Sequence, residues 1–334
     1  MGFLNLDAGS VVKLPAEGRR PESVHVLDGD SIDAINAALA AGRPLLLRGE
    51  PGTGKSQLAR AAAAALGRAF HSFVVDALTE PRDLLWRLDA VTRLAEAQLE
   101  GSLPGQAVDA LRKKLKEERF LQPGPIWWAL DWPSAEAQAT EAGLDHPSTP
   151  PHWSAADGMV LLIDEIDKAD AAVPNGLLEA LGQDRFVCPG GRVITTPPDV
   201  PPPLVVVTTN DERPLPQAFE RRCLVHRLAW PEPRADLIQR LVEWGQAHFE
   251  TCSGDVLQKA AGLLADDRDV MGSRSGRRPG GAEYLDLLRA AARLAEDDAV
   301  SASLEVSSPE ERMEVWIDRV AKFTLKKHSL GVDS

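Results

Sequence analysis

The sequence predicts an α/β protein in which a parallel sheet is sandwiched by helices and followed by a smaller all-helical domain. Apolar runs at 44–47, 159–163 and 204–208 are typical of strands buried on both faces. Strand and helix patterns alternate up to about residue 230, which favours a parallel sheet, and only helical patterns follow. A glycine-rich motif between the first apolar run and the next helix fits a phosphate-binding loop.

Composition and charge narrow the class of protein. Of the 334 residues, 44% are hydrophobic and 26% are charged, as expected for a soluble globular chain. The 37 basic and 50 acidic residues leave a net charge of −13, which counts against a nucleic-acid partner. We find no signal peptide and no apolar run long enough for a membrane span, so we expect a cytoplasmic protein without a membrane partner. Three distant cysteines argue against a zinc cluster or a disulfide framework.

The first half of the chain is expected to begin with an arm or loop and then to alternate helices and strands. In order, the predicted loop, helix, strand, helix and strand cover 1–23, 31–41, 44–47, 55–67 and 71–75. Asp30 or Ser31 is the expected N-cap of the first helix. Residues 82–117 are expected to be helical with a break at 101–105. Residues 133–157, poor in large aliphatic side chains, are expected to form an exposed insertion.

The second half is expected to hold the other two buried strands, a hairpin and a helical domain. The predicted strand, helix, hairpin, strand and four helices cover 159–163, 174–182, 185–196, 204–208, 234–249, 255–266, 281–296 and 309–325. We therefore expect an α/β nucleotide-binding domain over 1–230, with insertions at about 80–120 and 133–157, and a helical lid domain over 231–334. Four tryptophans, either core anchors or a partner surface, bracket the second insertion: Trp127, Trp128, Trp132 and Trp153.

The phosphate-loop motif GxxxxGK[ST] is matched at every defined position by residues 49–56. Glycines allow the backbone N–H groups of such a loop to point at phosphate oxygens. Lys55 is expected to reach the β- and γ-phosphates and Ser56 to bind Mg²⁺. The residues expected to contact the nucleotide here are Gly49, Glu50, Pro51, Gly52, Thr53, Gly54, Lys55, Ser56 and Gln57.

Two carboxylates end the second buried strand. Parallel strands carry ligands at their carboxyl ends, so Asp164 is expected to hold Mg²⁺ together with Ser56. Glu165 is expected to act as the base that orients and polarises an attacking water. Asp167 and Asp170, close by, are expected to belong to a solvated helix start rather than to the catalytic group.

Three stretches together are similar to AAA+ ATPases, and more narrowly to the MoxR-type branch: GEPGTGKS, LLIDEIDKAD and VVVTTNDERPLPQAFERRC. Shorter matches at 26–28, 122–126 and 215–218 support that branch, and the resemblance covers roughly residues 24–295. It implies that Asn210 sits between the γ-phosphate and the attacking water. It also implies that Arg222, with Arg221 as second choice, is an arginine finger acting on the nucleotide of a neighbouring subunit in a homo-oligomeric, hexameric ring.

The resemblance also extends to the adenine pocket and the lid. His25 and Val26 fall where the family lines the adenine pocket, although an aromatic residue is common at the position of His25. The lid arginine of the family corresponds to one of three arginines here, with Arg278 preferred: Arg274, Arg277 and Arg278. The hairpin 185–196 resembles an insertion that faces the pore of such rings.

The function implied is that of an ATP hydrolase, with ATP and Mg²⁺ as cofactors, whose ring remodels or activates a client protein. Proteins of the MoxR type are often linked to partners with von Willebrand factor A domains, which makes such a protein the implied client. Two other classes stay open: a slow nucleotide-gated regulatory or adaptor module, and a DNA-associated AAA+ motor. GTP also stays open in place of ATP, because a phosphate loop does not read the base.

Overall fold

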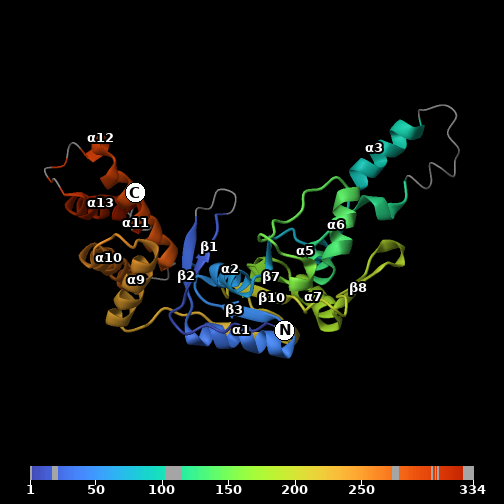
Figure 1. Ribbon diagram of the computed structural model, residues 1–334, viewed down its shortest axis with the longest axis horizontal. Coiled ribbons are helices and arrows are strands. Elements are labelled where there is room, and N and C mark those ends of the chain that lie inside the picture. The colour runs from blue at the N-terminus through green and yellow to red at the C-terminus, as the bar shows by residue number, and fades with distance from the viewer. Residues whose placement is uncertain are drawn as a thin grey trace. The chain divides into compact units, whose positions relative to one another are not determined.

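A computed structural model describes residues 2–16, 22–101, 115–272, 278–301, 304, 306 and 308–325 (Figure 1). The chain divides into two compact units. The first unit contains residues 1–8, 28–48 and 56–226, and the second contains residues 9–27, 49–55 and 227–334. In the part of the chain that the structure describes, no helix is long and apolar enough to cross a bilayer.

Five strands form the central sheet of the first unit (Figure 1). They are β3 Leu45–Arg48, β4 Ala69–Val74, β7 Met159–Asp164, β10 Leu204–Thr209 and β11 Leu224–Arg227. Their order is β11-β3-β10-β7-β4, and β10 runs parallel to β3 and β7, as does β4 to β7. This sheet confirms the predicted fold class and the four predicted strands. The edge strand β11 was not predicted.

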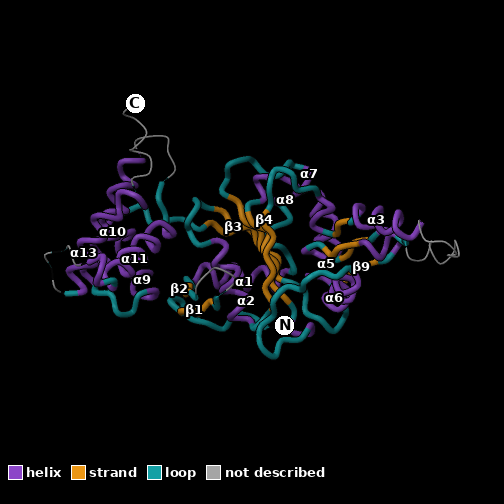
Figure 2. The backbone as a smooth tube through the Cα atoms, turned by 90° about the horizontal axis from the view of Figure 1, so that it is seen from above, coloured by secondary structure: helices purple, strands orange, loops and turns teal. Residues whose placement is uncertain are grey.

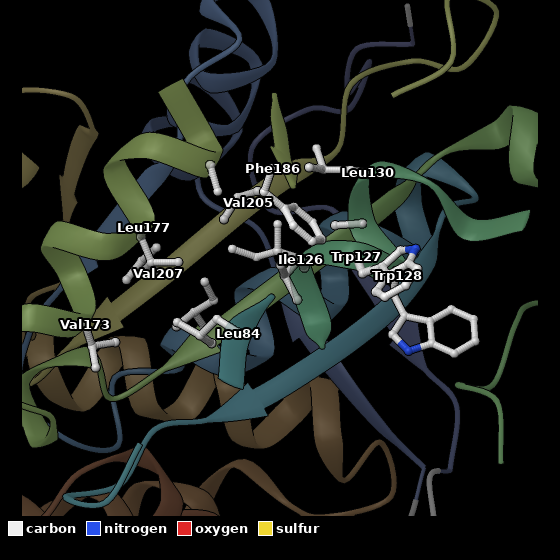
Figure 3. Packing of buried hydrophobic residues seen from close by; sticks show 14 of the residues in the cluster. Leu84, Ile126, Trp127, Trp128, Leu130, Val173, Leu177, Phe186, Val205 and Val207 are labelled. Carbon is white, nitrogen blue, oxygen red and sulfur yellow. The ribbon is translucent and has the colours of Figure 1, made fainter. Parts of the chain in front are cut away.

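Side chains of the sheet alternate between its two faces. On one face, residues of β7 and β10 pack against α5 Pro125–Leu130 and α7 Ala172–Gln183 in a single core cluster. Figure 3 shows part of that packing, with Ile126, Trp127, Val173 and Leu177 near Val205 and Val207. Helices α1 Gly29–Ala41 and α2 Lys55–Leu66 lie on the other side of the sheet (Figure 2). Both faces are therefore covered, which explains the continuous apolar runs.

The N-cap predicted for the first helix is wrong. The α1 helix begins at Gly29, and the carboxylate of Asp28 accepts a hydrogen bond of 2.8 Å from the Ser31 backbone N–H. An Asp just before a helix satisfies one of its free N–H groups in this way, so the cap lies ahead of both Asp30 and Ser31. Gly42 ends the helix in the left-handed conformation.

The helix predicted over 82–117 is only partly present. A 3₁₀ turn, Pro81–Leu84, is followed by β5 Trp86–Leu88, which pairs antiparallel with β6 Leu121–Pro123. The helix α3 covers Ala90–Gly101, and a second 3₁₀ turn covers Glu117–Phe120. Most of the predicted break at 101–105 lies outside the described residues. Trp86 and Leu88 pack on the core while Arg87 between them is exposed, a period of two that favours a strand.

The segment predicted as an exposed insertion is largely anchored. Its first part is a helix, α6 Trp132–Glu141, with a buried stripe that contains Trp132, Ala135 and Ala139. The ring of Trp132 lies 4.8 Å from that of Trp128 and 4.7 Å from that of Trp153, measured between centroids. The interpretation of the tryptophans as core anchors is thus confirmed, and full exposure of 133–157 is wrong. The predicted hairpin is confirmed as β8 Arg185–Val187 and β9 Val193–Thr195.

The second unit joins a small hairpin to a helical group. Strands β1 Val11–Leu14 and β2 Ser23–Val26 pair antiparallel, so the loop predicted over 1–23 is wrong at β1. The helices are α9 Arg234–His248, α10 Gly254–Gly272, α11 Gly281–Glu296, α12 Asp298–Ser301 and α13 Pro309–Thr324. They confirm the predicted helical region, with α10 longer than expected. Their core includes the fully buried Leu241, Leu257, Tyr284 and Ile317.

Candidate functional site

The carboxyl ends of β7 and β10 bring polar side chains together in the first unit. Because the two strands are neighbours and parallel, Asp164 at the end of β7 lies near the end of β10, where Thr208 and Asn210 stand. Ser56, in the first turn of α2, reaches the same group. The structure therefore joins four residues of the predicted site in one place: Ser56, Asp164, Glu165 and Asn210.

Ser56 and Asp164 form the part of this group that suits a metal ion. The Ser56 hydroxyl lies 3.0 Å from Oδ1 and 2.9 Å from Oδ2 of Asp164. Thr208 Oγ1 donates to Asp164 Oδ1 at 2.5 Å, which fixes the carboxylate. Hydroxyl and carboxylate oxygens fit Mg²⁺, which is commonly held by one or two carboxylates together with substrate phosphates and water. Among the described residues, no cluster of three or more His, Cys, Asp and Glu could hold an ion by protein ligands alone.

Glu165 is held in a left-handed conformation, with φ of 60° and ψ of 47°. Its backbone N–H donates to Thr208 Oγ1 at 2.9 Å, so Thr208 orients both acidic residues. One carboxylate oxygen of Glu165 accepts a bond of 3.4 Å from Asn210 Nδ2, and the other accepts a bond from the Lys168 ammonium. That hydrogen bond and the charge of Glu165 raise the pKa of Lys168. The Glu165 carboxylate is thus engaged on both oxygens.

Asp167 is buried, so the interpretation of it as a solvated residue is wrong. Only 2% of it is exposed, and its Oδ2 accepts from the backbone N–H groups of Asn210 at 3.2 Å and Glu212 at 2.9 Å. It ties the loop after β10 to the loop after β7. Asp170 does behave as a helix-start residue: it is exposed and accepts from the Ala172 N–H at 3.0 Å.

In the second unit, the phosphate loop curves around Lys55. Lys55 is 7% exposed, and its Nζ donates to the carbonyls of Gly49 at 2.7 Å and Glu50 at 2.9 Å. Gly49, Gly52 and Gly54 have φ of 152°, 79° and 91°. A Cβ at Gly49 would clash with the Leu228 carbonyl, so the glycine is required there. This is the geometry expected of a loop whose amides cradle phosphate.

His25 and Trp244 flank Gly54 of the loop. His25 is 6% exposed, its ring centroid is 6.4 Å from that of Trp244, and a Cβ at Gly54 would lie 3.3 Å from the Trp244 ring and 3.4 Å from that of His25. Val26 follows His25 in β2. Trp244, on α9, was missed from the sequence. It supplies an aromatic ring close to the position where the family resemblance expects one.

The two arginines after α8 Gln217–Glu220 lie on an anchored turn and have exposed side chains. Arg43 Nε donates to the Arg222 carbonyl at 2.9 Å, and its guanidinium also bonds the carbonyl of Arg221. Arg48 pairs with Glu220, one residue before Arg221. The role of Arg221 and Arg222 toward the nucleotide of a neighbouring subunit stays a prediction. In the second unit Arg278 is exposed, while Arg274 and Arg277 lie outside the described residues.

A parallel sheet with a phosphate loop after one buried strand and a carboxylate at the end of another defines a P-loop nucleotide-binding protein. The family described as AAA domain, dynein-related subfamily, matches residues 44–223, and the chain belongs to that family. Among solved structures, a protein of Cytophaga hutchinsonii provisionally described as an ATPase is 16% identical. That match covers 90% of this chain and 84% of the other, at a TM-score of 0.35. A search of curated proteins found no match.

Proposed function

We propose that this AAA+ protein hydrolyses ATP with Mg²⁺. The observation that carries the proposal is the Ser56 hydroxyl within 3.0 Å of both carboxylate oxygens of Asp164, directly after Lys55 in the chain. Lys55 would neutralise the β- and γ-phosphates, and Ser56 and Asp164 would hold Mg²⁺. When bound, Mg²⁺ neutralises charge that develops on the transferred phosphoryl group.

Glu165 and Asn210 are proposed to act on the attacking water. The Glu165 carboxylate accepts the water proton as general base, and the Asn210 amide holds the water or the γ-phosphate through its donor and acceptor atoms. The contact of 3.4 Å between Asn210 Nδ2 and Glu165 Oε1 supports a shared role, because both side chains reach the same point. The contact from Lys168 occupies the other Glu165 oxygen and supports a low basal rate.

We further propose a ring of the MoxR type, in which Arg222 acts on the nucleotide of the neighbouring subunit and Arg221 is the second choice. Their exposure on a turn fixed by Arg43 supports a role toward another molecule. A client protein, in particular one with a von Willebrand factor A domain, is the proposed target of remodelling. The three free cysteines fit a reducing compartment, and we place the protein in the cytoplasm.

The first test is phosphate release by the full chain with MgCl₂ and either ATP or GTP. Glu165→Gln is expected to lose turnover and keep ATP binding, whereas Lys55→Ala is expected to lose binding. Undiminished hydrolysis by Glu165→Gln would exclude Glu165 as the base. A wild-type chain that binds neither nucleotide would refute the proposed function, and preference for GTP would correct the substrate.

The second test concerns the ring and the client. Arg222→Ala and Glu165→Gln are each expected to be inactive alone and to regain hydrolysis when mixed, because a mixed ring contains sites with one intact copy of each residue. No recovery in a mixture that light scattering shows to be a ring would exclude action between subunits. A purified von Willebrand factor A domain protein is expected to bind the ATP-loaded Glu165→Gln chain and to accelerate wild-type hydrolysis. A DNA duplex with the same effect would favour the motor instead.

A further inference from the structure

A buried arginine of the second unit bridges the phosphate loop and the segment before α11. Arg268, near the end of α10, is 8% exposed. Its Nη1 donates to the Pro279 carbonyl at 2.6 Å, and its Nη2 donates to the Glu50 carboxylate at 2.9 Å. Glu50 belongs to the loop, and Pro279 precedes Gly280, the N-cap of α11. One side chain thus holds two segments that are far apart in the sequence.

The backbones of those two segments are also in direct contact. The Gly281 N–H donates to the Gly52 carbonyl at 3.1 Å. A Cβ at Gly280 would lie 2.8 Å from the Pro51 carbonyl oxygen, closer than real Cβ atoms come. A Cβ at Gly281 would clash with the Trp244 ring. A glycine is therefore needed at position 280 for the phosphate loop to approach this closely, and one at position 281 leaves room for the Trp244 ring.

The positive charge at this contact comes from Arg268 on α10 and not from the first turn of α11. The first turn of α11 carries Ala282 and Glu283, and the Glu283 carboxylate accepts from the Gly280 N–H at 2.9 Å. Arg278 is exposed. A guanidinium stays protonated when buried, and a buried charge is tolerated only where it is paired and hydrogen-bonded. Arg268 meets this condition with a carboxylate and a carbonyl, so Glu50 is part of what keeps it in place.

The pair of Arg268 and Glu50 also affects the position of Lys55. The Glu50 carbonyl accepts from Lys55 Nζ at 2.9 Å and from Thr53 Oγ1 at 2.9 Å. The position of Glu50 therefore sets the position of the group that holds Lys55. A shift of α10 that moved Arg268 would move Glu50, and with it the curve of the loop.

We propose that Arg268 is a positioning residue that couples the helices α10 and α11 to the phosphate loop through Glu50. The proposal rests on the proposed function, since the ligand whose affinity it controls is a nucleoside triphosphate. In this arrangement the helices α10 and α11 respond to the nucleotide through the phosphate loop and not through a side chain in the first turn of α11. The effect falls on nucleotide binding more than on the chemical step.

The test is a double-mutant cycle with Glu50→Gln, Arg268→Lys and the pair of changes together. Each single variant is expected to weaken ATP binding about tenfold, the loss typical of a charged hydrogen bond. The double variant is expected to bind ATP no more weakly than the singles, and the effect of Arg268→Lys is expected to fall on KM more than on kcat. The matched control is Arg234→Lys, since Arg234 pairs with Asp266 and Asp269 on the surface of the same unit and is expected to change neither quantity.

A second readout needs no nucleotide. In hydrogen exchange on the empty chain, both Glu50→Gln and Arg268→Lys are expected to speed exchange at the Gly281 amide, and Arg234→Lys is not. Additive losses, or effects no larger than those of Arg234→Lys, would overturn the proposal. If wild type bound no nucleotide, the proposed function would fail, and the coupling would then be accepted or rejected on the exchange cycle alone.

Discussion

The ammonium group of Lys168 is hydrogen-bonded to the carboxylate of Glu165, the residue proposed to activate water. The Asn210 amide occupies the other oxygen of the same carboxylate. An attacking water must therefore compete with the ammonium and the amide for the same carboxylate oxygens. If Glu165 activates water as proposed, hydrolysis is expected to be slow until Lys168 is displaced.

Replacing Lys168 is expected to release that restraint. Lys168→Met keeps the length of the side chain and removes the charge, so the basal kcat for ATP is expected to rise by about two- to fivefold, in the range of an exposed ion pair. Lys168→Arg, which retains the pair, is the control and is expected to stay near wild type. The measurement is steady-state phosphate release without client. A fall in kcat for Lys168→Met would show that the ammonium helps the reaction.

Thr208 is expected to matter for metal use, because its hydroxyl contacts both acidic residues. It donates to Asp164 Oδ1 at 2.5 Å and accepts from the Glu165 N–H at 2.9 Å. Thr208→Val keeps the shape and removes both bonds, so the Mg²⁺ concentration that gives half-maximal turnover is expected to rise about tenfold. Thr208→Ser is expected to restore most of it. An unchanged Mg²⁺ titration for Thr208→Val would contradict this role.

The sequence is most informative where a short local motif carries the chemistry. Lys55, Ser56, Asp164 and Glu165 were predicted because a short local motif carries the chemistry, and the structure places the last three together. The sequence predicts Thr208 only as the last residue of an apolar strand. Its hydroxyl gains a role from the neighbouring strand β7, and the sequence carries no signal for which strands are neighbours.

Burial was the other property that the sequence did not reveal. Asp167 and Asp170 look alike in the pattern, yet one is buried under the loop after β10 and the other is exposed. Arg268 and Trp244 likewise stand in ordinary helical patterns, and their importance depends on the loop from another part of the chain. Strands of three residues, such as β5, are too short for a periodicity to be recognised.

Asp167 is expected to contribute to stability and to the position of Asn210. Asp167→Ala leaves two backbone N–H groups without their carboxylate, which is expected to cost about 1–3 kcal/mol. Asp167→Asn retains an acceptor oxygen and is expected to lose less. Thermal unfolding measures the stability, and kcat measures the placement of Asn210. Equal melting temperatures for Asp167→Ala and wild type would contradict the anchoring role.

Arg43 is expected to affect hydrolysis indirectly, because it fixes the turn that carries Arg221 and Arg222. Its guanidinium bonds the carbonyls of Arg221 and Arg222, so Arg43→Ala frees the turn that carries both side chains. If Arg222 acts on a neighbour, Arg43→Ala is expected to lower hydrolysis about tenfold and to regain activity when mixed with Glu165→Gln, as Arg222→Ala would. Arg82→Ala, which breaks an exposed pair with Glu80 elsewhere in the unit, is the control. Loss of ATP binding by Arg43→Ala would instead indicate a folding defect.

His71 is expected to make the protein sensitive to mild acid. Burial in β4 lowers the pKa of His71 from 6.5 to about 4. Between these values the unfolded chain binds a proton that the folded chain does not, so stability falls as the pH drops from about 6.5 to about 4, by at most about 3 kcal/mol. Burial lowers the pKa of His248 in the second unit in the same way.

The measurement is the melting temperature across pH 4–8 for variants that remove one imidazole each. His71→Gln is expected to flatten the acid side of the profile, so its melting temperature relative to that of wild type should rise as the pH falls from about 6.5 to about 4. His152→Asn is the control, because His152 is exposed and Asn tolerates its positive φ of 62°. This control is expected to keep the wild-type slope. A wild-type slope in His71→Gln as well would assign the acid sensitivity to other groups, with His248→Gln as the next variant to measure.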